Sequence, residues 1–362
     1  MHRAGDSSLS GRRQAGLTLI EFMVSIVIGM LMIAALAVLI ANQSTTRTDI
    51  DKSGRTIENG RYAVQTMRDD IQMAGYWGEL TNQPAPPGAL PDPCSVTVAD
   101  LQAAMGLHVQ GYDAPATLPV SLQDCVHNHK PGTDVLVVRR VDPDTSSTET
   151  AGNTDLSKVV PGQVYLQTGL DAVTGTLLTA VMAAGSADAA LNTATFVLTK
   201  KDKIQRSSVR KLVVAIYYIS QCSVPVGGSC TSADGGTPVP TLKRVELGVA
   251  AGSPTFTTIT IAEGIENLQV DYGVDGVDMD GSPNGVDVNG SALTVADWPN
   301  VVTLKIHLLA RSNEPTAGFV DSKSYALGSA GAASAAVGEQ GYKRHVFVQS
   351  VRLVNPSGRR LL

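Results

Sequence analysis

A chain of 362 residues can form one large domain or two of ordinary size. Its 43% hydrophobic and 17% charged residues are typical of a folded protein and exclude a largely disordered one. The net charge of −5, without a basic stripe of interleaved aromatic residues, gives no reason to expect direct nucleic-acid binding.

A polar leader, residues 1–16, precedes a long apolar segment, residues 17–41, in which Glu21 is the only charged residue. About 20 apolar residues are enough to span a bilayer as a helix, so this segment is predicted to be transmembrane. The arginines of the leader indicate that the leader stays in the cytoplasm and that the rest of the chain is exported. No small-residue cleavage site follows the segment, whereas Ala15 and Gly16 precede it. Cleavage there would leave the apolar segment in the mature protein.

The helical pattern continues over residues 42–76. Apolar residues recur there every seven positions, and charged residues cover the other faces, which is typical of an amphipathic helix. The recurring residues are Ile50, Ile57, Val64 and Ile71. We therefore predict one continuous helix over residues 17–74. Its side chains that are expected to pack on the following domain are Ile57, Val64, Met67 and Ile71.

Glycine and proline set the expected limits of this helix. Gly54 and Gly60 are expected to weaken it, because glycine loses the most conformational freedom in a helix. Gly75, followed by the sequence PAPPGALPDP, is expected to end it.

Residues 77–362 are predicted to form a β-rich globular domain. β-branched, partly alternating segments recur there with Gly, Pro, Asn and Asp between them. The predicted strands are 134–141, 209–219, 241–249, 255–262, 266–274, 300–310 and 343–354. Residues 317–341 are rich in small residues and are interpreted as a surface loop. The predicted fold class is α+β: a long N-terminal helix packed on a predominantly antiparallel, meander-like β-sheet.

The four cysteines are Cys94, Cys125, Cys222 and Cys230, and none lies in a CxxC pair. The short Gly- and Pro-containing segment between Cys222 and Cys230 favours a local disulfide over a zinc site. Cys94 would then pair with Cys125. Four cysteines allow three connectivities, so the other two pairings stay open at this point. Disulfides would place the domain in an oxidising compartment.

Residues 275–290 are acidic and rich in Gly and Asn. Aligned with a twelve-residue EF-hand loop, Asp278 and Asp280 occupy ligand positions, and Asp287 occupies the last one. Gly276 occupies the first position and offers no side-chain ligand. Two interpretations remain: a solvated turn, or a weak Ca²⁺ site that also uses Asp275. We predict no other cofactor.

The remaining polar motifs do not suggest catalysis. His127 and His129, beside Cys125, are interpreted as loop histidines, because a disulfide at Cys125 would leave two candidate metal ligands. The arginine pairs 139–140 and 359–360 are interpreted as solvated surface or partner contacts. The chain has no GxSxG, phosphate-binding glycine loop or HExxH motif, and we predict that it is not an enzyme.

The N-terminal segment resembles a known signal. Gly16 followed by LTLIEFMVS resembles the class III signal of type IV prepilins, in which a glycine precedes the cut and a glutamate is the fifth mature residue. Two further segments are similar to segments of PilW-like minor pilins: IENGRYAVQTMRDDIQMAGYWGE (57–79) and IENLQVDYGVD (265–275). This resemblance implies a pilin-like fold and cleavage between Gly16 and Leu17. It also implies N-methylation of Leu17, a position where pilins more often have phenylalanine.

The resemblance also implies a role for Glu21. In pilins the glutamate is thought to attract the new amino terminus of a neighbouring subunit during assembly, an attraction that is strong at low dielectric but reduced by desolvation. The alternative is that the Glu21 carboxylate only snorkels to the nearby membrane interface.

The function implied by the resemblance is that of a minor pilin that initiates or caps a type IV pilus. Its implied partners are other minor pilins, the major pilin, the prepilin peptidase, the inner-membrane assembly platform and a pilus-tip adhesin. The protein would cross the inner membrane once with a periplasmic domain, and would be extracellular after assembly. A pseudopilin of a type II secretion system and a membrane-anchored periplasmic binding module are the alternatives.

Overall fold

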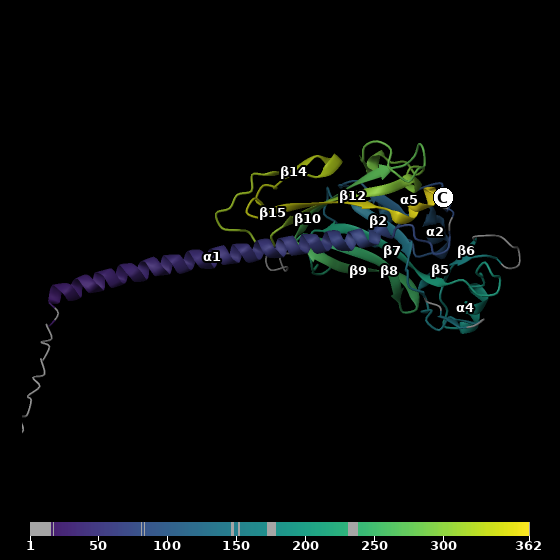
Figure 1. Ribbon diagram of the computed structural model, residues 1–362, viewed down its shortest axis with the longest axis horizontal. Coiled ribbons are helices and arrows are strands. Elements are labelled where there is room, and N and C mark those ends of the chain that lie inside the picture. Colours follow the sequence, from purple (N-terminus) through teal and green to yellow (C-terminus); the bar gives the residue numbers. More distant parts are fainter. Residues whose placement is uncertain are drawn as a thin grey trace, which may run out of the picture. The chain divides into compact units, whose positions relative to one another are not determined.

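The computed structural model describes residues 16, 18–80, 82, 84–145, 148–150, 153–171, 179–230 and 238–361 (Figure 1). The chain divides after Asp51 into two compact units. The long N-terminal helix α1, Leu19–Gln72, contributes to both units. The predicted helix began at Leu17, which lies outside the described residues.

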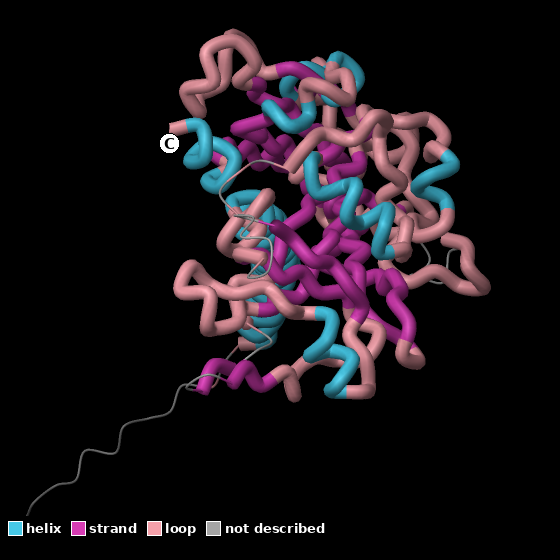
Figure 2. Tube along the Cα trace, turned by 90° about the vertical axis from the view of Figure 1, so that its right-hand side faces the viewer, coloured by secondary structure: helices cyan, strands magenta, loops and turns pink. Residues whose placement is uncertain are grey.

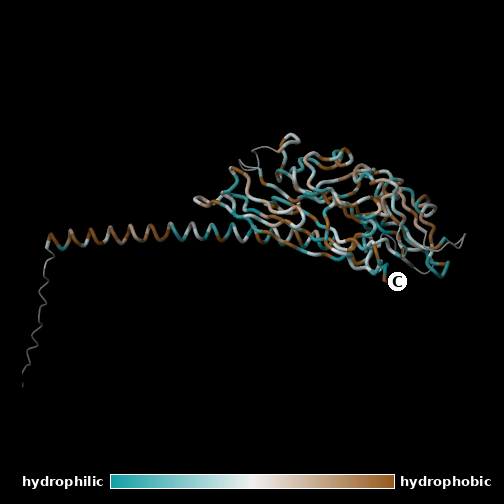
Figure 3. The backbone as a smooth tube through the Cα atoms, turned by 90° about the horizontal axis from the view of Figure 1, so that it is seen from above, coloured by the Kyte–Doolittle hydropathy of each residue, from teal (hydrophilic) through white to brown (hydrophobic). Residues whose placement is uncertain are grey.

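The first part of α1 is apolar on all sides. Between Leu19 and Ile40 every large apolar side chain is at least 42% exposed. Figure 3 shows this part of the helix as almost continuously hydrophobic. Within the described residues, α1 is the one helix long and apolar enough to cross a membrane.

The part of α1 in the second unit packs through one face. Its buried residues follow helical spacing and are Thr56, Gly60, Ala63, Met67, Asp70 and Ile71. The prediction was right for Met67 and Ile71, and Val64 is partly buried against the same core. It was wrong for Ile57, which remains 38% exposed. A seven-residue repeat drifts by about 20° per repeat on a straight α-helix, so residues seven positions apart do not keep the same face.

Gly60 permits close packing of α1. A Cβ atom built on Gly60 would lie 2.1 Å from the Phe347 ring. The sequence predicted only that this glycine weakens the helix, whereas the structure shows that it makes room for an aromatic ring.

Within the described residues there are two larger antiparallel sheets and two short hairpins. The first sheet is built around β7, which pairs with β2, β5 and β8. Three more strands extend the sheet: β1 pairs with β2, β6 with β5, and β9 with β8. The bounds are β1 Val109–Tyr112, β2 Val135–Val141, β5 Val164–Gly169, β6 Thr179–Ala184, β7 Val209–Ser220, β8 Thr241–Ala250 and β9 Ser253–Glu263.

The second sheet has the strand order β11-β10-β12-β15. Its strands are β10 Ile265–Val274, β11 Val288–Asn289, β12 Val301–Arg311 and β15 Arg344–Arg352. The hairpin strands are β3 Thr148–Thr150, β4 Asn153–Asp155, β13 Ser324–Ala326 and β14 Ala332–Ser334. The short helices are α2 Val98–Ala103, α3 Val120–Gln123, α4 Ala189–Thr195 and α5 Val354–Arg360, with 3₁₀ turns η1 Ala104–Gly106, η2 Gly290–Ala292, η3 Trp298–Asn300 and η4 Gly328–Ala330. Figure 2 shows these helices and loops gathered around the strands.

Both faces of β7, the strand at the centre of the first sheet, are buried, and its side chains alternate between these two faces. On β7, Tyr217 and Ile219 face the core shared with α1 and the second sheet. Ile216 and Tyr218 face a second core that contains Trp77 and the Cys94–Cys125 disulfide. This double burial explains why the β7 sequence is apolar almost throughout.

All seven predicted strands are present, with ends that differ by one or two residues. The predicted strand 343–354 ends at Arg352, because Val354 already belongs to helix α5. The strands β1, β5 and β6 were not predicted. Residues 317–341 are more structured than the predicted surface loop, since they include the β13–β14 hairpin and the buried side chains of Asp321 and Leu327.

Candidate assembly and ion-binding sites

The N-terminus of α1 is closed by a capping box. The Glu21 carboxylate accepts hydrogen bonds from the backbone N–H and the hydroxyl of Thr18, both at 2.9 Å. The Glu21 N–H in turn donates to the Thr18 hydroxyl at 3.4 Å. This reciprocal pattern satisfies two donors that a helix start otherwise leaves unpaired. The Thr-x-x-Glu spacing at 18–21 could have predicted it.

The predicted processing site lies directly before this cap. Gly16 is exposed, with open space where a side chain would be. Leu17, the predicted first mature residue, lies outside the described residues. Cleavage at this bond and the assembly role of Glu21 therefore remain predictions.

The structure contains both disulfides that the sequence favours. Cys94 and Cys125 are 31 residues apart and their Cα atoms are separated by 5.6 Å. Cys222 and Cys230 are eight residues apart, with Cα atoms separated by 5.4 Å. Each disulfide closes a loop and so reduces the entropy of the unfolded chain.

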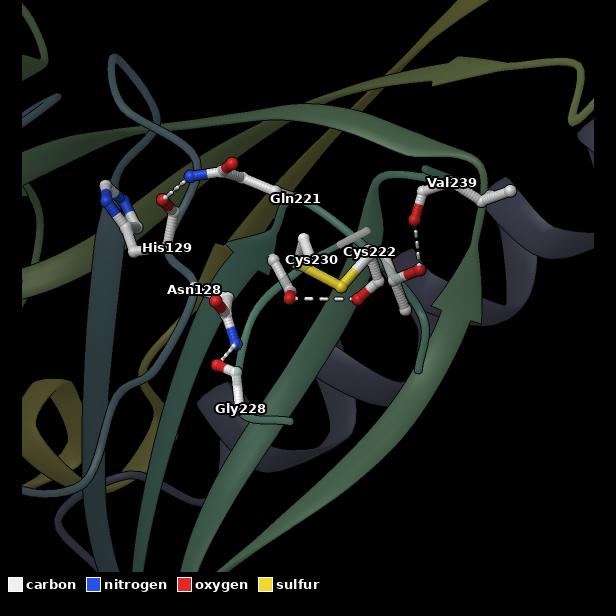
Figure 4. Close-up of a disulfide and its surroundings, with 9 residues drawn as sticks. Asn128, His129, Gln221, Cys222, Gly228, Cys230 and Val239 are labelled. Carbon is white, nitrogen blue, oxygen red and sulfur yellow. Dashed lines mark hydrogen bonds between the residues drawn. A yellow bond between two sulfur atoms is a disulfide. The ribbon is translucent and has the colours of Figure 1, made fainter. Parts of the chain in front are cut away.

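The Cys222–Cys230 loop is also tied to its surroundings by hydrogen bonds (Figure 4). The Asn128 amide donates to the Gly228 carbonyl at 3.0 Å, and the Ser220 hydroxyl donates to the Cys222 carbonyl at 2.9 Å. The Gln221 amide donates to the His129 carbonyl at 2.9 Å. These bonds hold the loop against the end of the first sheet.

The acidic segment after β10 brings three carboxylates together. One oxygen each from Asp275, Asp278 and Asp280 lies within 4.8 Å of the others. That spacing is compatible with oxygens around a Ca²⁺ ion at the usual 2.3–2.6 Å distance. Asp275 is fully buried and one of its oxygens, Oδ1, has no hydrogen-bond partner, whereas Asp278 and Asp280 are exposed.

A positively charged side chain of the protein already lies beside the Asp275 carboxylate. Arg360 of α5 forms an ion pair with the Asp275 carboxylate at 2.9 Å. Burial acts to raise the pKa of Asp275, but Arg360 and the Gly281 N–H hold it below its ordinary value. Arg360 therefore competes with any metal for Asp275, and three carboxylates fall short of the six to eight oxygens that Ca²⁺ takes.

Asp287 is not part of the carboxylate cluster. It immediately precedes β11, whose Val288 is held in register with Tyr272 of β10. The predicted EF-hand alignment does not hold at its last position, because β11 pairing takes Asp287 away from the turn. Weak Ca²⁺ binding by the other three aspartates remains a prediction.

The arginine pairs are not the solvated surface that the sequence suggested. Arg139 is buried and donates to the Leu107 carbonyl at 3.1 Å and to the Gln110 side chain at 2.7 Å. Burial lowers its pKa to about 10. Arg359 donates to the Gly75 carbonyl at the end of the α1 region.

Arg140 belongs to a buried cluster around Asp70 that the sequence did not reveal. The Asp70 carboxylate accepts from Arg140 at 2.7 Å, from Arg244 at 3.1 Å and from the Tyr217 hydroxyl. Asp70 lies on α1, and its three partners lie on β2, β7 and β8. The cluster thus fastens α1 to the first sheet.

Cys125 cannot act as a metal ligand together with the nearby histidines, because its sulfur is bonded to Cys94. The His129 ring is buried and hydrogen-bonds the Thr133 carbonyl at 2.9 Å. Its role is structural.

Two family models match the chain. The prokaryotic N-terminal methylation motif matches residues 11–37, and the model described as type IV pilus-assembly protein W, PilW, matches residues 216–355. No curated protein and no solved structure matches the chain. A prepilin-type signal, an apolar N-terminal helix and an antiparallel β domain define a type IV pilin anchored in a membrane by that helix.

Within this class the chain is a PilW-like pilin. It acts as a minor pilin in type IV pilus assembly and interacts with other components of the pilus.

Proposed function

We propose that this minor pilin initiates or caps the pilus as part of a complex with other minor pilins, and that it contacts the major pilin. The observation that supports this proposal is the exposed apolar helix between Leu19 and Ile40, which continues into a domain with two disulfides. Contiguous apolar surface of this extent marks a membrane or protein contact. Nothing in the described chain covers it, so lipid and then neighbouring pilin helices are its natural surroundings.

We further propose a route to the filament. The leader stays on the cytoplasmic side of the membrane. The domain folds in the periplasm, and the disulfides form there. The prepilin peptidase cleaves between Gly16 and Leu17, and the inner-membrane assembly platform moves the protein into an extracellular pilus, where a tip adhesin is a further partner. The role is structural, and we assign no catalytic step to it.

A type II secretion pseudopilin would share the N-terminal helix and its processing. The PilW match over residues 216–355 supports the pilus instead, because it concerns the globular domain and not the common signal.

Blocking the processing step tests this function. Gly16 has open space around it, so Gly16→Val should leave the fold intact. We expect the variant to remain uncleaved, by mass spectrometry of the amino terminus, and to lower the number of surface filaments and the co-purification of other pilins. Gly11→Val, in the same leader, is the matched control and should behave as wild type. Normal filament number in an uncleaved Gly16→Val strain would contradict the proposal, and a wild-type protein that is never cleaved would favour the membrane-anchored binding module.

A further inference from the structure

Strand β9 forms one edge of the first sheet. Among the described residues, β8 is the one strand that pairs with it. Figure 1 shows β9 beside β8 at the lower border of the domain. Residues 257–260 are all exposed, although neighbouring side chains of a strand point to opposite faces. This part of β9 is therefore open on its edge and on both faces.

The hairpin that begins β9 determines which backbone groups point to the open edge. Its two-residue turn, Ala251 and Gly252, has positive φ at both positions, as a type I′ turn requires. The residues that flank such a turn form a hydrogen-bonded pair, and along an antiparallel ladder hydrogen-bonded and non-hydrogen-bonded pairs alternate. This register points the N–H and C=O groups of Phe256, Thr258 and Thr260 away from β8.

Two features limit the open edge. Pro254 lies at the first outward-pointing position and has no N–H to donate. A register shift opposite Leu242 and Lys243 leaves Ile261 unpaired and ends the regular ladder. Residues 255–260, between these two points, are the regular part of the edge.

This edge carries no charge. Residues 253–262 include no Asp, Glu, Lys, Arg or His, and threonine is the commonest residue among them. Natural edge strands are often protected from further pairing by charged side chains. The edge strand of the second sheet, β15, carries such residues in Arg344, His345 and Arg352. Because β9 lacks them, its edge can accept another strand.

We propose that a neighbouring pilus subunit adds an extended, uncharged segment to β9 and so continues the first sheet. The row of outward-pointing N–H and C=O groups defines this occupant, because an extended backbone matches the whole row, as in β-strand addition. The segment is uncharged, because a charge beside the threonines of β9 would find no opposite charge across the pair. The inference rests on the proposed function in assigning the segment to a pilus subunit.

A second copy of β9 fits this edge less well. Antiparallel pairing of β9 with itself requires a two-fold axis perpendicular to the sheet. Helix α1 packs on a face of that sheet, where its Asp70 pairs with Arg244 of β8, so this axis would reverse the direction of α1 in one copy. Pilins that are anchored in one membrane by their N-terminal helices share one direction. The added segment is therefore a strand other than β9.

Peptide binding to the purified full-length protein in detergent tests the edge directly. The probes are acetyl-STVTVTS-amide and the same peptide N-methylated at its three central residues, which removes the N–H donors that strand pairing needs. We expect the unmethylated peptide to bind about fivefold more tightly. Because the contact involves no charge, this preference should be the same at low and at high salt.

Thr258 offers a variant and its matched control. Thr258→Pro removes an N–H that points away from β8, and proline is tolerated at such positions of an edge strand, so the hairpin should stay folded. This variant should bind the two peptides equally. Thr258→Val also removes the hydroxyl but keeps the N–H, and it should bind as the wild type does. Thr258→Lys keeps the backbone and adds a charge at the edge, so it should weaken binding of the unmethylated peptide about fivefold.

Thermal unfolding checks that each variant is folded. Equal binding of the two peptides by the wild type, or an unchanged preference in folded Thr258→Pro and Thr258→Lys, would overturn the inference. Sedimentation of the protein without peptide tests self-pairing. A wild-type dimer that Thr258→Pro dissociates would make a second copy the occupant and would overturn the assignment to another strand.

Filament assembly separates this inference from the proposed function. We expect Thr258→Pro to be cleaved normally but to co-purify less of its partner pilins than Thr258→Val. If blocked cleavage at Gly16 abolishes filaments while Thr258→Pro keeps its partners, the function stands and the strand-addition inference is wrong. If blocked cleavage has no effect on filaments, the proposed function fails, and the assignment of the segment to a pilus subunit fails with it.

Discussion

Single buried charges connect the helix to the sheet in this protein. Asp70 is the clearest case, because its carboxylate receives two guanidinium groups and a tyrosine hydroxyl from three different strands. A buried pair of this kind is not itself a large net source of stability, since desolvation offsets the attraction. Removing Asp70 is costly, because Arg140 then loses the carboxylate that pairs with it, whereas Arg244 keeps its ion pair with Glu246 at 3.0 Å.

Asp70→Asn is therefore expected to lower the free energy of unfolding by about 3–5 kcal/mol. Asp69→Asn is the matched control, because Asp69 is the adjacent residue, is exposed and bonds only the exposed Gln65 among the contacts described. We expect the control to change stability by about 0.5 kcal/mol or less. Urea denaturation followed by circular dichroism measures both, and equal effects of the two variants would contradict a fastening role for Asp70.

His108 should make stability depend on pH. Burial lowers its pKa to about 4, although its hydrogen bond with the Val301 carbonyl acts in the opposite direction. An unfolded histidine has its ordinary pKa of about 6.5, so between these values the unfolded chain binds more protons. The contribution of His108 is thus complete above about pH 6.5 and is lost as the pH falls towards 4, by about 3 kcal/mol in total.

Unfolding free energies measured from pH 8 to pH 4 check this expectation. His108→Gln keeps a hydrogen-bond donor but does not titrate, so it should reduce the loss of stability at low pH. The loss should not vanish, because burial also lowers the pKa of His129 and of His307. An identical pH profile for wild type and His108→Gln would show that His108 is not held neutral in the folded state.

At the scale of elements, the contact between α1 and β15 determines how Gly→Ala substitutions at two positions of α1 change stability. Gly60 faces the Phe347 ring, whereas Gly54 has open space where its side chain would be. Alanine is a better helix former than glycine by about 1 kcal/mol, so propensity alone predicts that both Gly→Ala changes stabilise.

We expect Gly54→Ala to stabilise the domain by about 0.5–1 kcal/mol. Gly60→Ala should instead destabilise it by about 1–3 kcal/mol, because the new methyl group would overlap the Phe347 ring. Thermal unfolding of the two variants provides the comparison. Stabilisation by both changes would mean that α1 and β15 are not in close contact.

The acidic turn after β10 offers a test within one element. If Asp275, Asp278 and Asp280 bind Ca²⁺, calorimetry should show heat with a dissociation constant of about 10⁻⁴–10⁻³ M. Asp278→Asn should weaken this binding, whereas Asp287→Asn should not, because Asp287 lies outside the cluster. No heat at millimolar Ca²⁺ would mean that the aspartates only form a solvated turn held by Arg360.

At the scale of the whole molecule, the apolar helix needs surroundings that the described chain does not supply. Within it Glu21 has a local role, since it caps the helix through Thr18, and a predicted role between subunits. The two roles differ in what they require. Capping uses the Thr18 hydroxyl and the Glu21 oxygens, whereas pairing with a neighbouring amino terminus requires the negative charge.

Three variants separate these roles in a filament assay. Glu21→Ala should leave membrane insertion and cleavage unchanged but reduce incorporation into filaments. Glu21→Gln should be equally defective if the ion pair matters, because the amide can still cap the helix without a charge. Thr18→Val should be mild in that case and severe if capping is the main role. Normal filaments in Glu21→Ala would support the snorkelling alternative.

The sequence by itself determined the parts of this protein that depend on local patterns. The apolar segment before Asn42 and strands such as β7 are defined by composition and periodicity over short windows. The signal around Gly16 is defined by its resemblance to prepilin signals. The short Cys222–Cys230 spacing favoured one of three possible disulfide pairings, and that pairing is the one in the structure.

Only the tertiary structure decided the features that join distant segments. Arg140 and Arg360 are structural ion-pair partners because β2 lies against α1 and because α5 returns to the acidic turn. Gly60 became a packing residue only because β15 brings Phe347 onto α1. The physical reason is that a side chain's role is set by what lies within a few ångströms of it, and in a sheet of long-range pairings those neighbours are far away in sequence.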